Sequence, residues 1–257
     1  MTILYIIAFL VVAGLAIWAF GIEPYRVHLH REDVPIPDLP ETLGGLSIVH
    51  LSDLHVRRYD RRHRLAVRYI HSSEPDLIAI TGDFGTENFS DLTELLYKLR
   101  YKAPVFGCIG NNDSDLEALR DAFRKTNARL LVDEAAVHQS PRGSLTVLGI
   151  QPTTPVERVR ELVRDTPRPR LLLSHYPDIF DRIDDEVDLV LSGHTHGGQC
   201  RLPIAGPIQL GGTGRAYAAG LFRKERCSLF VTRGLGTYII NARFLCPPEV
   251  ALLRLRR

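Results

Sequence analysis

The sequence predicts an α/β fold in which two packed β-sheets are covered on the outside by helices. Along the middle of the chain, apolar runs of strand length alternate with segments of helical periodicity. Short strand-like runs separated by glycines follow after residue 199. Strand–helix units followed by further strands are typical of stacked sheets with external helices. The 257 residues, 45% of them hydrophobic, suffice for one large domain or two small ones.

Residues 1–22 contain no charged side chain and are predicted to form one transmembrane helix. The run from Ile3 to Ile22 is long enough to span a hydrocarbon core of about 30 Å. A cleaved signal peptide is the alternative. The segment has no Lys or Arg before its apolar run, exceeds the usual length of about 7–15 residues, and has no clear cleavage site. We therefore expect an uncleaved anchor.

The residues after the helix predict its orientation. Arg26 and Arg31 are the first basic side chains after the helix, and none precedes it. Because basic residues collect on the cytoplasmic side of membrane helices, the rest of the chain is expected in the cytoplasm, at the inner membrane. Residues 23–44 are expected to be a linker with an edge strand, since Pro35 and Pro37 exclude a helix and restrict strand pairing.

Helices and strands of the remaining chain follow from periodicity. Leucines at helical spacing predict helices around residues 92–99 and 116–123, an amphipathic pattern predicts another over Pro155–Asp165, and one more runs to about His71. Late strands are expected at Leu145–Ile150, Ser228–Thr232 and Val250–Leu255. The glycine cluster at residues 211–214 is interpreted as a tight turn rather than a phosphate cradle.

Five predicted strands end in residue types that bind metals. These residues are Asp53 and His55 after strand 47–51, Asp83 after 76–80, Asn111 after 104–109, His175 after 170–173, and His194 and His196 after 187–191. Open α/β sheets keep their binding sites at the carboxyl ends of strands, so these side chains should converge. Seven ligands exceed the roughly four of one zinc-like ion and suit two ions that share a carboxylate.

In this order, the motifs Asp53-x-His55, Gly82-Asp83, Gly110-Asn111, His175 and Gly193-His194-Thr195-His196 resemble the calcineurin-like metallophosphoesterase superfamily. The resemblance runs from about Gly45 to the C-terminus, so residues 45–257 are expected to form the catalytic domain. It implies a four-layer αββα sandwich with metals at the strand ends. The string from Gly193 to Gln199, with the later segments 233–236 and 246–249, is similar to a membrane-associated bacterial branch. That branch includes phosphodiesterases and a UDP-2,3-diacylglucosamine pyrophosphatase.

The resemblance also implies how the ligands are shared. One metal should take Asp53, His55, Asp83 and His196, and the other should take Asp83, Asn111, His175 and His194. Asp83 is then the bridge. Two cations about 3.5–4 Å apart lower the pKa of a shared water and neutralise charge on phosphoryl oxygens. Mixed oxygen and imidazole ligands without thiolate favour Mn²⁺, with Zn²⁺ or Fe²⁺ as alternatives.

One residue departs from the superfamily pattern. Where most members carry a His after the Asn ligand, this chain has Asn112. The resemblance gives that position a catalytic role, in steadying the transition state or protonating the leaving oxygen. An amide donates a hydrogen bond but is no general acid at neutral pH. Asn112 therefore favours a pyrophosphate, whose leaving phosphate is stable as an anion, over a simple alkyl ester.

The loop after His55 is rich in arginine, and Arg57 and Arg58 are candidates for contacts with a substrate phosphate. A solvated loop and a loop facing acidic lipids are alternatives. The net charge of +2 gives no indication of a nucleic-acid partner. Four scattered cysteines, without a C-x-x-C pair, favour a reducing compartment.

These features predict a metal-dependent phosphohydrolase at the membrane. The specific hypothesis is a UDP-2,3-diacylglucosamine pyrophosphatase that releases UMP and lipid X in lipid A biosynthesis, so the expected partners are the membrane and an acylated nucleotide-sugar or another membrane lipid. A general phosphodiesterase or phosphatase of cell-envelope or nucleotide esters is one alternative. A non-catalytic scaffold of the same fold is another. The oligomeric state is left open.

Overall fold

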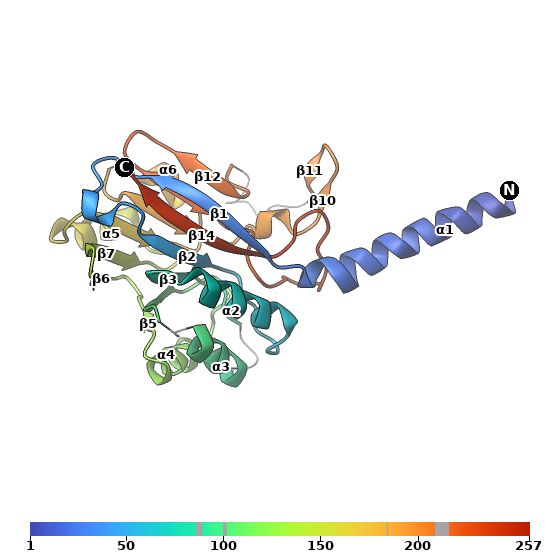
Figure 1. The fold of residues 1–257 in the computed structure, drawn as a ribbon, viewed down its shortest axis with the longest axis horizontal. Helices are drawn as coiled ribbons and strands as arrows, with labels where there is room; N and C mark the ends of the chain where they lie inside the picture. The colour runs from blue at the N-terminus through green and yellow to red at the C-terminus, as the bar shows by residue number, and fades with distance from the viewer. Residues whose placement is uncertain (86–88, 100–101, 184, 209–215) are drawn as a thin grey trace.

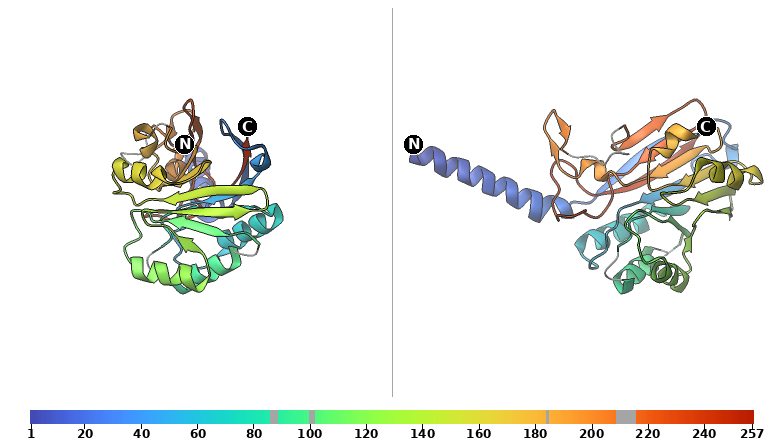
Figure 2. Two further views of the ribbon diagram at one scale, coloured as in Figure 1. Left: turned by 90° about the vertical axis from the view of Figure 1, so that its left-hand side faces the viewer. Right: turned by 180° about the vertical axis from the view of Figure 1, so that it is seen from behind.

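The computed structural model describes residues 1–85, 89–99, 102–183, 185–208 and 216–257, and the glycine cluster at 211–214 lies outside them. Within these residues, two six-stranded sheets stack face to face, and helices cover both outer faces (Figures 1 and 2). The predicted α/β sandwich with external helices is confirmed.

The first sheet has the order β1-β14-β2-β3-β4-β5. Its strands are β1 (His28–Pro35), β14 (Glu249–Arg256), β2 (Ser47–Leu51), β3 (Leu77–Thr81), β4 (Val105–Cys108) and β5 (Arg129–Leu130). Helices α2 (Arg61–Ser73), α3 (Phe89–Leu99) and α4 (Leu116–Lys125) pack on its outer face. Strand β1 lies at the edge and runs parallel to β14, which is antiparallel to β2.

The second sheet has the order β12-β13-β9-β8-β7-β6. Its strands are β12 (Gly220–Arg223), β13 (Ser228–Val231), β9 (Leu189–Ser192), β8 (Arg170–Leu173), β7 (Gly143–Gly149) and β6 (Glu134–Ser140). Helices α5 (Val156–Arg164) and α6 (Ile179–Arg182) pack on its outer face. A hairpin of β10 (Arg201–Leu202) and β11 (Gly206–Pro207) follows a short helical turn, η4 (His196–Gly198).

Burial on both faces explains why the central strands are almost wholly apolar. In β3, Leu77 and Ala79 pack between the two sheets, whereas Ile78 and Ile80 pack under the helices. A strand covered on both sides has few positions for a polar side chain until it leaves the core. The first polar residues after each strand therefore gather at the edge of the sandwich.

The N-terminal segment projects from the domain as a single rod (Figure 1). Helix α1 (Thr2–Ile17) continues through a π-helical turn, η1 (Trp18–Ile22), and a 3-10 turn, η2 (Glu23–Tyr25). The rod from Thr2 to Tyr25 has a mean hydropathy of 2.7 in its most apolar window, which is 0% buried, and it is long and apolar enough to cross a membrane.

Strand register fixes where this rod leaves the sandwich. His28, the first residue of β1, pairs with Glu249, the first residue of β14. Ala251 pairs with His50, near the carboxyl end of the antiparallel β2. The rod therefore emerges at the same end of the sandwich as the carboxyl ends of β2, β3 and β4.

Candidate metal centre

The seven predicted ligands all follow the carboxyl ends of β2, β3, β4, β8 and β9. The structure brings five of them into two groups whose ligand atoms lie within 4.8 Å of one another. The groups are Asp53, His55 and His196, and Asp53, Asp83 and His175. His194 belongs to neither group, but its ring lies next to that of His175. Asn111 lines the same cavity as His55.

In the first group, two imidazoles and a carboxylate converge. The Nε2 atom of His196 lies 3.2 Å from His55 Nε2 and 3.3 Å from Asp53 Oδ1. The two rings stack, with centroids 5.1 Å apart and an interplanar angle of 18°. Three ligand atoms at these separations suit a single divalent cation between them.

In the second group, the tautomer of His175 is set by the backbone. Its Nδ1–H donates to the carbonyl oxygen of Thr81 at 2.7 Å, so Nε2 carries the lone pair. That buried Nε2 atom has no hydrogen-bond partner among the described residues and lies 3.5 Å from Asp83 Oδ1. A buried imidazole held in this way fits a metal ligand.

Asp83, a member of the second group, also approaches His55 of the first group. Its Oδ2 atom is 3.5 Å from His55 Nε2, while its Oδ1 atom is 3.5 Å from His175 Nε2. Each carboxylate oxygen thus faces a histidine of a different group. His194 adds its backbone N–H, which donates to Asp53 Oδ2 at 3.0 Å, and its ring lies 5.1 Å from that of His175.

Burial sets the charges of these groups. Burial raises the pKa of Asp53 to about 6. Burial would also raise the pKa of Asp83, but the imidazoles of His175 and His55 and hydrogen bonds from Asn112 hold it below its usual value. Burial lowers the pKa of His55 and of His194 to about 4. The imidazoles of His55 and His194 are therefore neutral near pH 7, as cation ligands must be.

Most of the predicted ligands have a left-handed backbone. Positive φ angles occur at Asp53 (51°), His55 (42°), Asp83 (54°), His194 (69°) and His196 (50°). Residues other than glycine rarely adopt this region, and where they do, the surrounding structure must hold them there. Here the backbone N–H of Asp53 donates to Gly82 O, and that of His55 donates to Asp83 O, both at 3.0 Å.

Two glycines allow the strand ends to approach each other. A side chain at Gly193 would collide with Ser52 Oγ and with Asp53 Oδ2, and one at Gly110 would collide with Asp83 Oδ1. These close approaches explain why a glycine precedes His194 and another precedes Asn111. Only a residue without Cβ lets the neighbouring carboxylate sit so close to the backbone.

Asp113 supports the centre from beneath, a role that the sequence did not reveal. Its carboxylate accepts hydrogen bonds from the backbone N–H groups of Asp83 (2.9 Å), Phe84 (2.8 Å) and Gly110 (2.7 Å). Asp113 thereby ties the end of β3 to the loop after β4. Its position three residues after Gly110 could have indicated this role, because a short polar side chain there can accept a hydrogen bond from the backbone of its own loop.

The two asparagines take different positions. Asn112 contacts Asp83, with its Nδ2 atom 2.6 Å from Oδ2 and its backbone N 2.9 Å from Oδ1. Asn111, the predicted ligand, is exposed. A cavity of about 420 Å³ opens over the centre, lined by His55, Arg57, Gly85, Asn111, Asn112, Ser114, Tyr238 and Ile239. Both Arg57 and Arg58 are exposed, but only Arg57 is one of the lining residues of this cavity.

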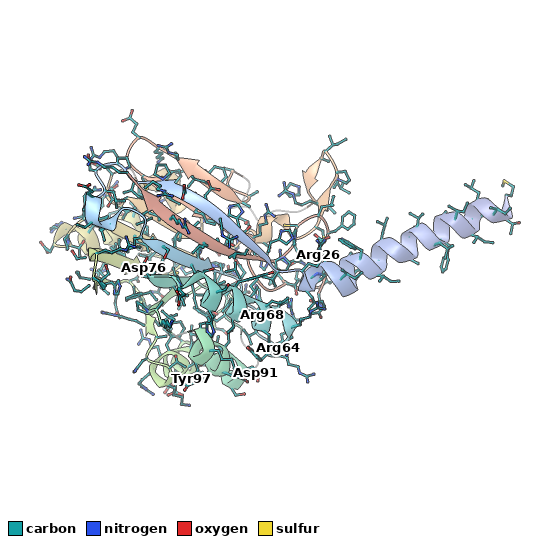
Figure 3. The ribbon with its side chains drawn as sticks, viewed as in Figure 1. Arg26, Arg64, Arg68, Asp76, Asp91 and Tyr97 are labelled. Atoms are coloured by element: carbon teal, nitrogen blue, oxygen red, sulfur yellow. The ribbon has the colours of Figure 1, made fainter. Side chains whose placement is uncertain are left out.

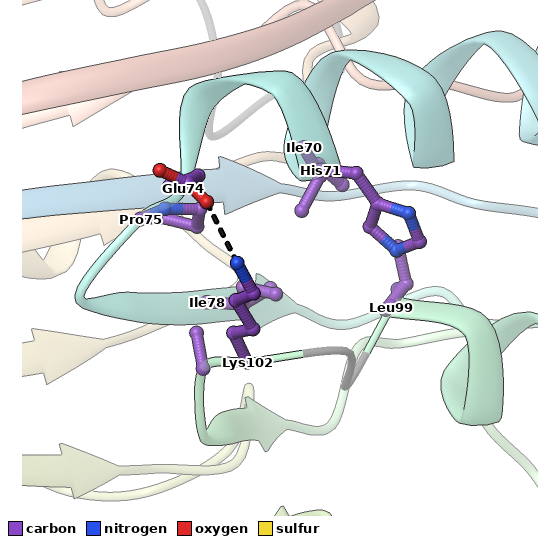
Figure 4. Close-up of a pocket in the computed structure, with 8 residues that line it drawn as sticks. Ile70, His71, Glu74, Pro75, Ile78, Leu99 and Lys102 are labelled. Carbon is purple, nitrogen blue, oxygen red and sulfur yellow. Dashed lines mark hydrogen bonds and ion pairs between the residues drawn. The ribbon is translucent and has the colours of Figure 1, made fainter.

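Another pocket, between β3 and the helices α2 and α3, is too small for a ligand (Figure 4). Its volume is about 10 Å³, room for roughly one water. The ion pair between Lys102 Nζ and Glu74 Oε1, at 2.8 Å, lies across it. The cavity at the strand ends is therefore the better candidate for substrate binding.

Comparison with known proteins agrees with this geometry. The chain belongs to the calcineurin-like phosphoesterase family, whose model matches residues 46–198. This family uses divalent metal ions and acts on phosphate esters, so the chain is a hydrolase of such esters.

Two bacterial relatives illustrate the range of the family. The chain is 30% identical to phosphodiesterase YaeI of Escherichia coli, over 84% of both chains. It is 28% identical to UDP-2,3-diacylglucosamine pyrophosphatase LpxG of Chlamydia muridarum, over 93% of this chain and 92% of the relative. The fold resembles the crystal structure of TT1561 of Thermus thermophilus, with a TM-score of 0.50 at 13% identity, over 74% of this chain and 90% of that one.

Proposed function

We propose that the chain hydrolyses its phosphate substrate at two divalent cations bridged by Asp83. Asp53, His55 and His196 would complete one site, and His175, His194 and Asn111 would complete the other. The observation that carries this proposal is the position of Asp83, with one oxygen facing His55 and the other facing His175. When bound, the two ions would supply a nucleophile at neutral pH and neutralise charge on the phosphoryl oxygens.

The protein side chains would hold and orient the reacting groups. Thr81 O keeps His175 in the tautomer that presents Nε2. Asn112 and Asp113 fix Asp83 from two sides through its carboxylate and its backbone. Arg57, at the wall of the cavity, would attract a substrate phosphate. Mn²⁺ is the proposed metal, with Zn²⁺ and Fe²⁺ as alternatives, because the ligands are carboxylates, imidazoles and an amide.

The proposed substrate is UDP-2,3-diacylglucosamine, cleaved to UMP and lipid X. Three features support it: the relative LpxG bears this activity in its name, the apolar rod suits a lipid-bound substrate, and Asn112 cannot protonate a poor leaving group. The second candidate is a general phosphodiesterase, favoured by the similarity to YaeI.

A direct assay separates these candidates. The purified full chain is incubated with Mn²⁺ and either UDP-2,3-diacylglucosamine or bis(p-nitrophenyl) phosphate, and UMP or nitrophenol is measured. Release of UMP at much the higher kcat/KM supports the pyrophosphatase. Preference for the diester supports the phosphodiesterase. A chain that binds no metal and cleaves neither substrate would be a scaffold of the same fold.

We further propose that residues 1–22 anchor the chain in the inner membrane, that residues 23–44 are a linker and the edge strand β1, and that residues 45–257 form a cytoplasmic catalytic domain. The bias of Arg26 and Arg31 supports this orientation. Reporter enzymes fused after Arg257 test it. A cytoplasmic reporter should be active, and activity of a periplasmic reporter alone would reverse the orientation.

A further inference from the structure

Two loops expose large apolar side chains to solvent. The exposed residues are Leu202, Ile204 and Ile208 in the β10–β11 hairpin, and Tyr238, Ile239, Ile240 and Leu245 in the segment between β13 and β14. We call these seven residues the apolar loops. Ile204, at the tip of the hairpin, is 109% exposed, and Ile239 is 72% exposed. Among the described residues after the N-terminal rod, the other exposed large hydrophobic side chains are Tyr97 and Val137.

The apolar loops form one surface because hydrogen bonds join them. Gln199 Nε2 donates to the carbonyl oxygens of Tyr238 and Ile240, both at 3.2 Å. The backbone N–H of Arg201 donates to Phe244 O at 2.8 Å, and that of Phe244 donates to Gln199 O at 3.1 Å. A cluster of exposed apolar residues on a single surface, unlike scattered ones, is typical of a contact with a protein or a membrane.

This surface adjoins the base of the rod. The backbone N–H of Arg243 donates to Ala19 O at 2.9 Å, and that of Cys246 donates to Glu23 Oε1 at 2.6 Å. Asn241 Nδ2 donates to the hydroxyl of Tyr25 at 3.1 Å. In Figures 1 and 2 the β10–β11 hairpin lies at the end of the sandwich from which α1 projects.

Exposed arginines lie at the same end of the domain. Arg26 follows the rod directly, and Arg64 and Arg68 lie on α2 below it (Figure 3). The first turn of α2 reaches the rod, since the guanidinium of Arg62 lies 5.2 Å from the centre of the Tyr25 ring. Basic side chains beside an apolar surface suit the anionic headgroups and the apolar interior of a lipid bilayer.

We propose that the apolar loops enter the interfacial layer of the bilayer that the rod crosses. Lipid, rather than a second protein, is the occupant because the surface is continuous with the base of a helix that suits a membrane. Tyr238 and Ile239 also line the cavity over the metal centre, so the cavity would open at the lipid surface. This inference rests on the proposed function. With the cavity at the lipid surface, the preferred substrates would be phosphate compounds whose apolar part stays in the bilayer.

Depth-dependent quenching tests the contact directly. The full chain, carrying Cys200→Ser to remove the partly exposed thiol, is labelled with the fluorophore NBD at Ile204→Cys or, as a matched control, at Tyr97→Cys. Each protein is placed in phospholipid nanodiscs at one chain per disc. We expect brominated acyl chains to quench the probe at 204 several-fold more than the probe at 97. Equal quenching of the two probes would overturn the proposal. Protection of the 204 probe from water only in discs that hold two chains would also overturn it, because a second chain would then be the occupant.

An activity assay then tests the consequence. The double variant Leu202→Asp/Ile204→Asp should lower kcat/KM about tenfold or more toward an amphiphilic pyrophosphate held in vesicles, since each buried apolar side chain contributes at least that much. Its activity on soluble bis(p-nitrophenyl) phosphate should not change, and Tyr97→Asp should change neither. An unchanged rate on vesicles would refute the coupling. A wild type that cleaves neither compound would refute the proposed function, whereas the quenching result would still decide the membrane contact.

Discussion

The Nε2 atoms of His55 and His196 lie 3.2 Å apart, although 141 positions separate the two residues in the sequence. Burial holds the pKa of His55 at about 4 and that of His196 well below its usual value, so both rings are neutral near pH 7. In neutral rings, the two nitrogens can share at most one proton, and a cation between them would use both lone pairs. This pair makes metal binding and folding interdependent.

Metal binding should therefore stabilise the fold. Adding Mn²⁺ to protein stripped with a chelator should raise the free energy of unfolding by about 2.7 kcal/mol when the free ion is at a hundred times its Kd. Thermal unfolding at several Mn²⁺ concentrations measures this, with Mg²⁺ at equal ionic strength as the control for general salt effects. A Tm that does not respond to any of Mn²⁺, Zn²⁺ or Fe²⁺ would contradict a metal centre here.

Asp83→Ala should abolish hydrolysis and reduce bound metal from about two ions per chain to one or fewer, because both proposed sites lose a ligand. The loss of activity should exceed about 10²-fold, the upper range for residues that only orient ligands. Metal analysis of the purified variant measures the first effect. Asp165→Ala, which removes an exposed carboxylate outside the centre, is the control. Two tightly bound ions in Asp83→Ala would exclude the bridging role.

Asn112→His should change the dependence of the rate on the leaving group. The imidazole would supply a titratable group with a reference pKa of about 6.5, lowered by neighbouring cations. A general acid can contribute about 10²-fold, and the gain should appear for alkyl esters but not for pyrophosphates. Rates across esters of rising leaving-group pKa measure the two slopes. We expect a steep slope for the wild type and a shallower slope for the variant. Equal slopes would show that Asn112 does not affect leaving-group chemistry and gives no support to a pyrophosphate substrate.

His50 should make the fold sensitive to acid. This side chain is 0% exposed and shares one hydrogen bond with Thr81, between Nε2 and Oγ1 at 2.9 Å. Burial lowers its pKa to about 3. In the unfolded chain His50 has a pKa of about 6.5, so it is protonated below that pH, whereas in the folded chain it stays neutral. Stability therefore falls as the pH falls from about 6.5 toward 3. Its share is about 1.4 kcal/mol per pH unit.

The variant His50→Gln isolates this contribution. Urea unfolding of wild type and variant at pH 7, 6, 5 and 4 gives the difference in their free energies of unfolding. That difference should shift in favour of the variant as the pH falls, while other titrating groups cancel between the two proteins. Parallel curves across this range would show that His50 takes up a proton in the folded chain as readily as in the unfolded chain.

Arg243→Met should destabilise the domain by roughly 3 kcal/mol or more. Its side chain is fully buried and donates to the carbonyl oxygens of Arg233, Gly234, Gly236 and Cys246. The same segment supports the centre, because the N–H of Gly236 donates to Asp53 O at 2.7 Å. Denaturant unfolding of the variant, with the exposed Arg120→Met as control, measures the effect. A loss no larger than that of the control would mean that water replaces the guanidinium.

The sequence by itself determined the strands and the chemical types at their ends. A strand buried on both faces is largely apolar, so β3 stands out in the sequence, and Asp83 is the first charged residue beyond it. The N-terminal rod was equally evident, because no polar face interrupts it. Strand β6 and helix α6 were not predicted. In β6 Ala136 is the one buried residue, and α6 is a single turn, so neither produces a strong periodic signal.

Only the tertiary structure decided which atoms meet. Periodicity reports the surroundings of each residue along its own strand or helix, whereas contacts such as those of Asn112 with Asp83 depend on left-handed backbone angles and on loops that return from distant parts of the chain. The burial of Arg243 and the hydrogen bonds from Gln199 to Tyr238 and Ile240 are of the same kind. Their energies come from packing between segments far apart in sequence, and no local pattern encodes that packing.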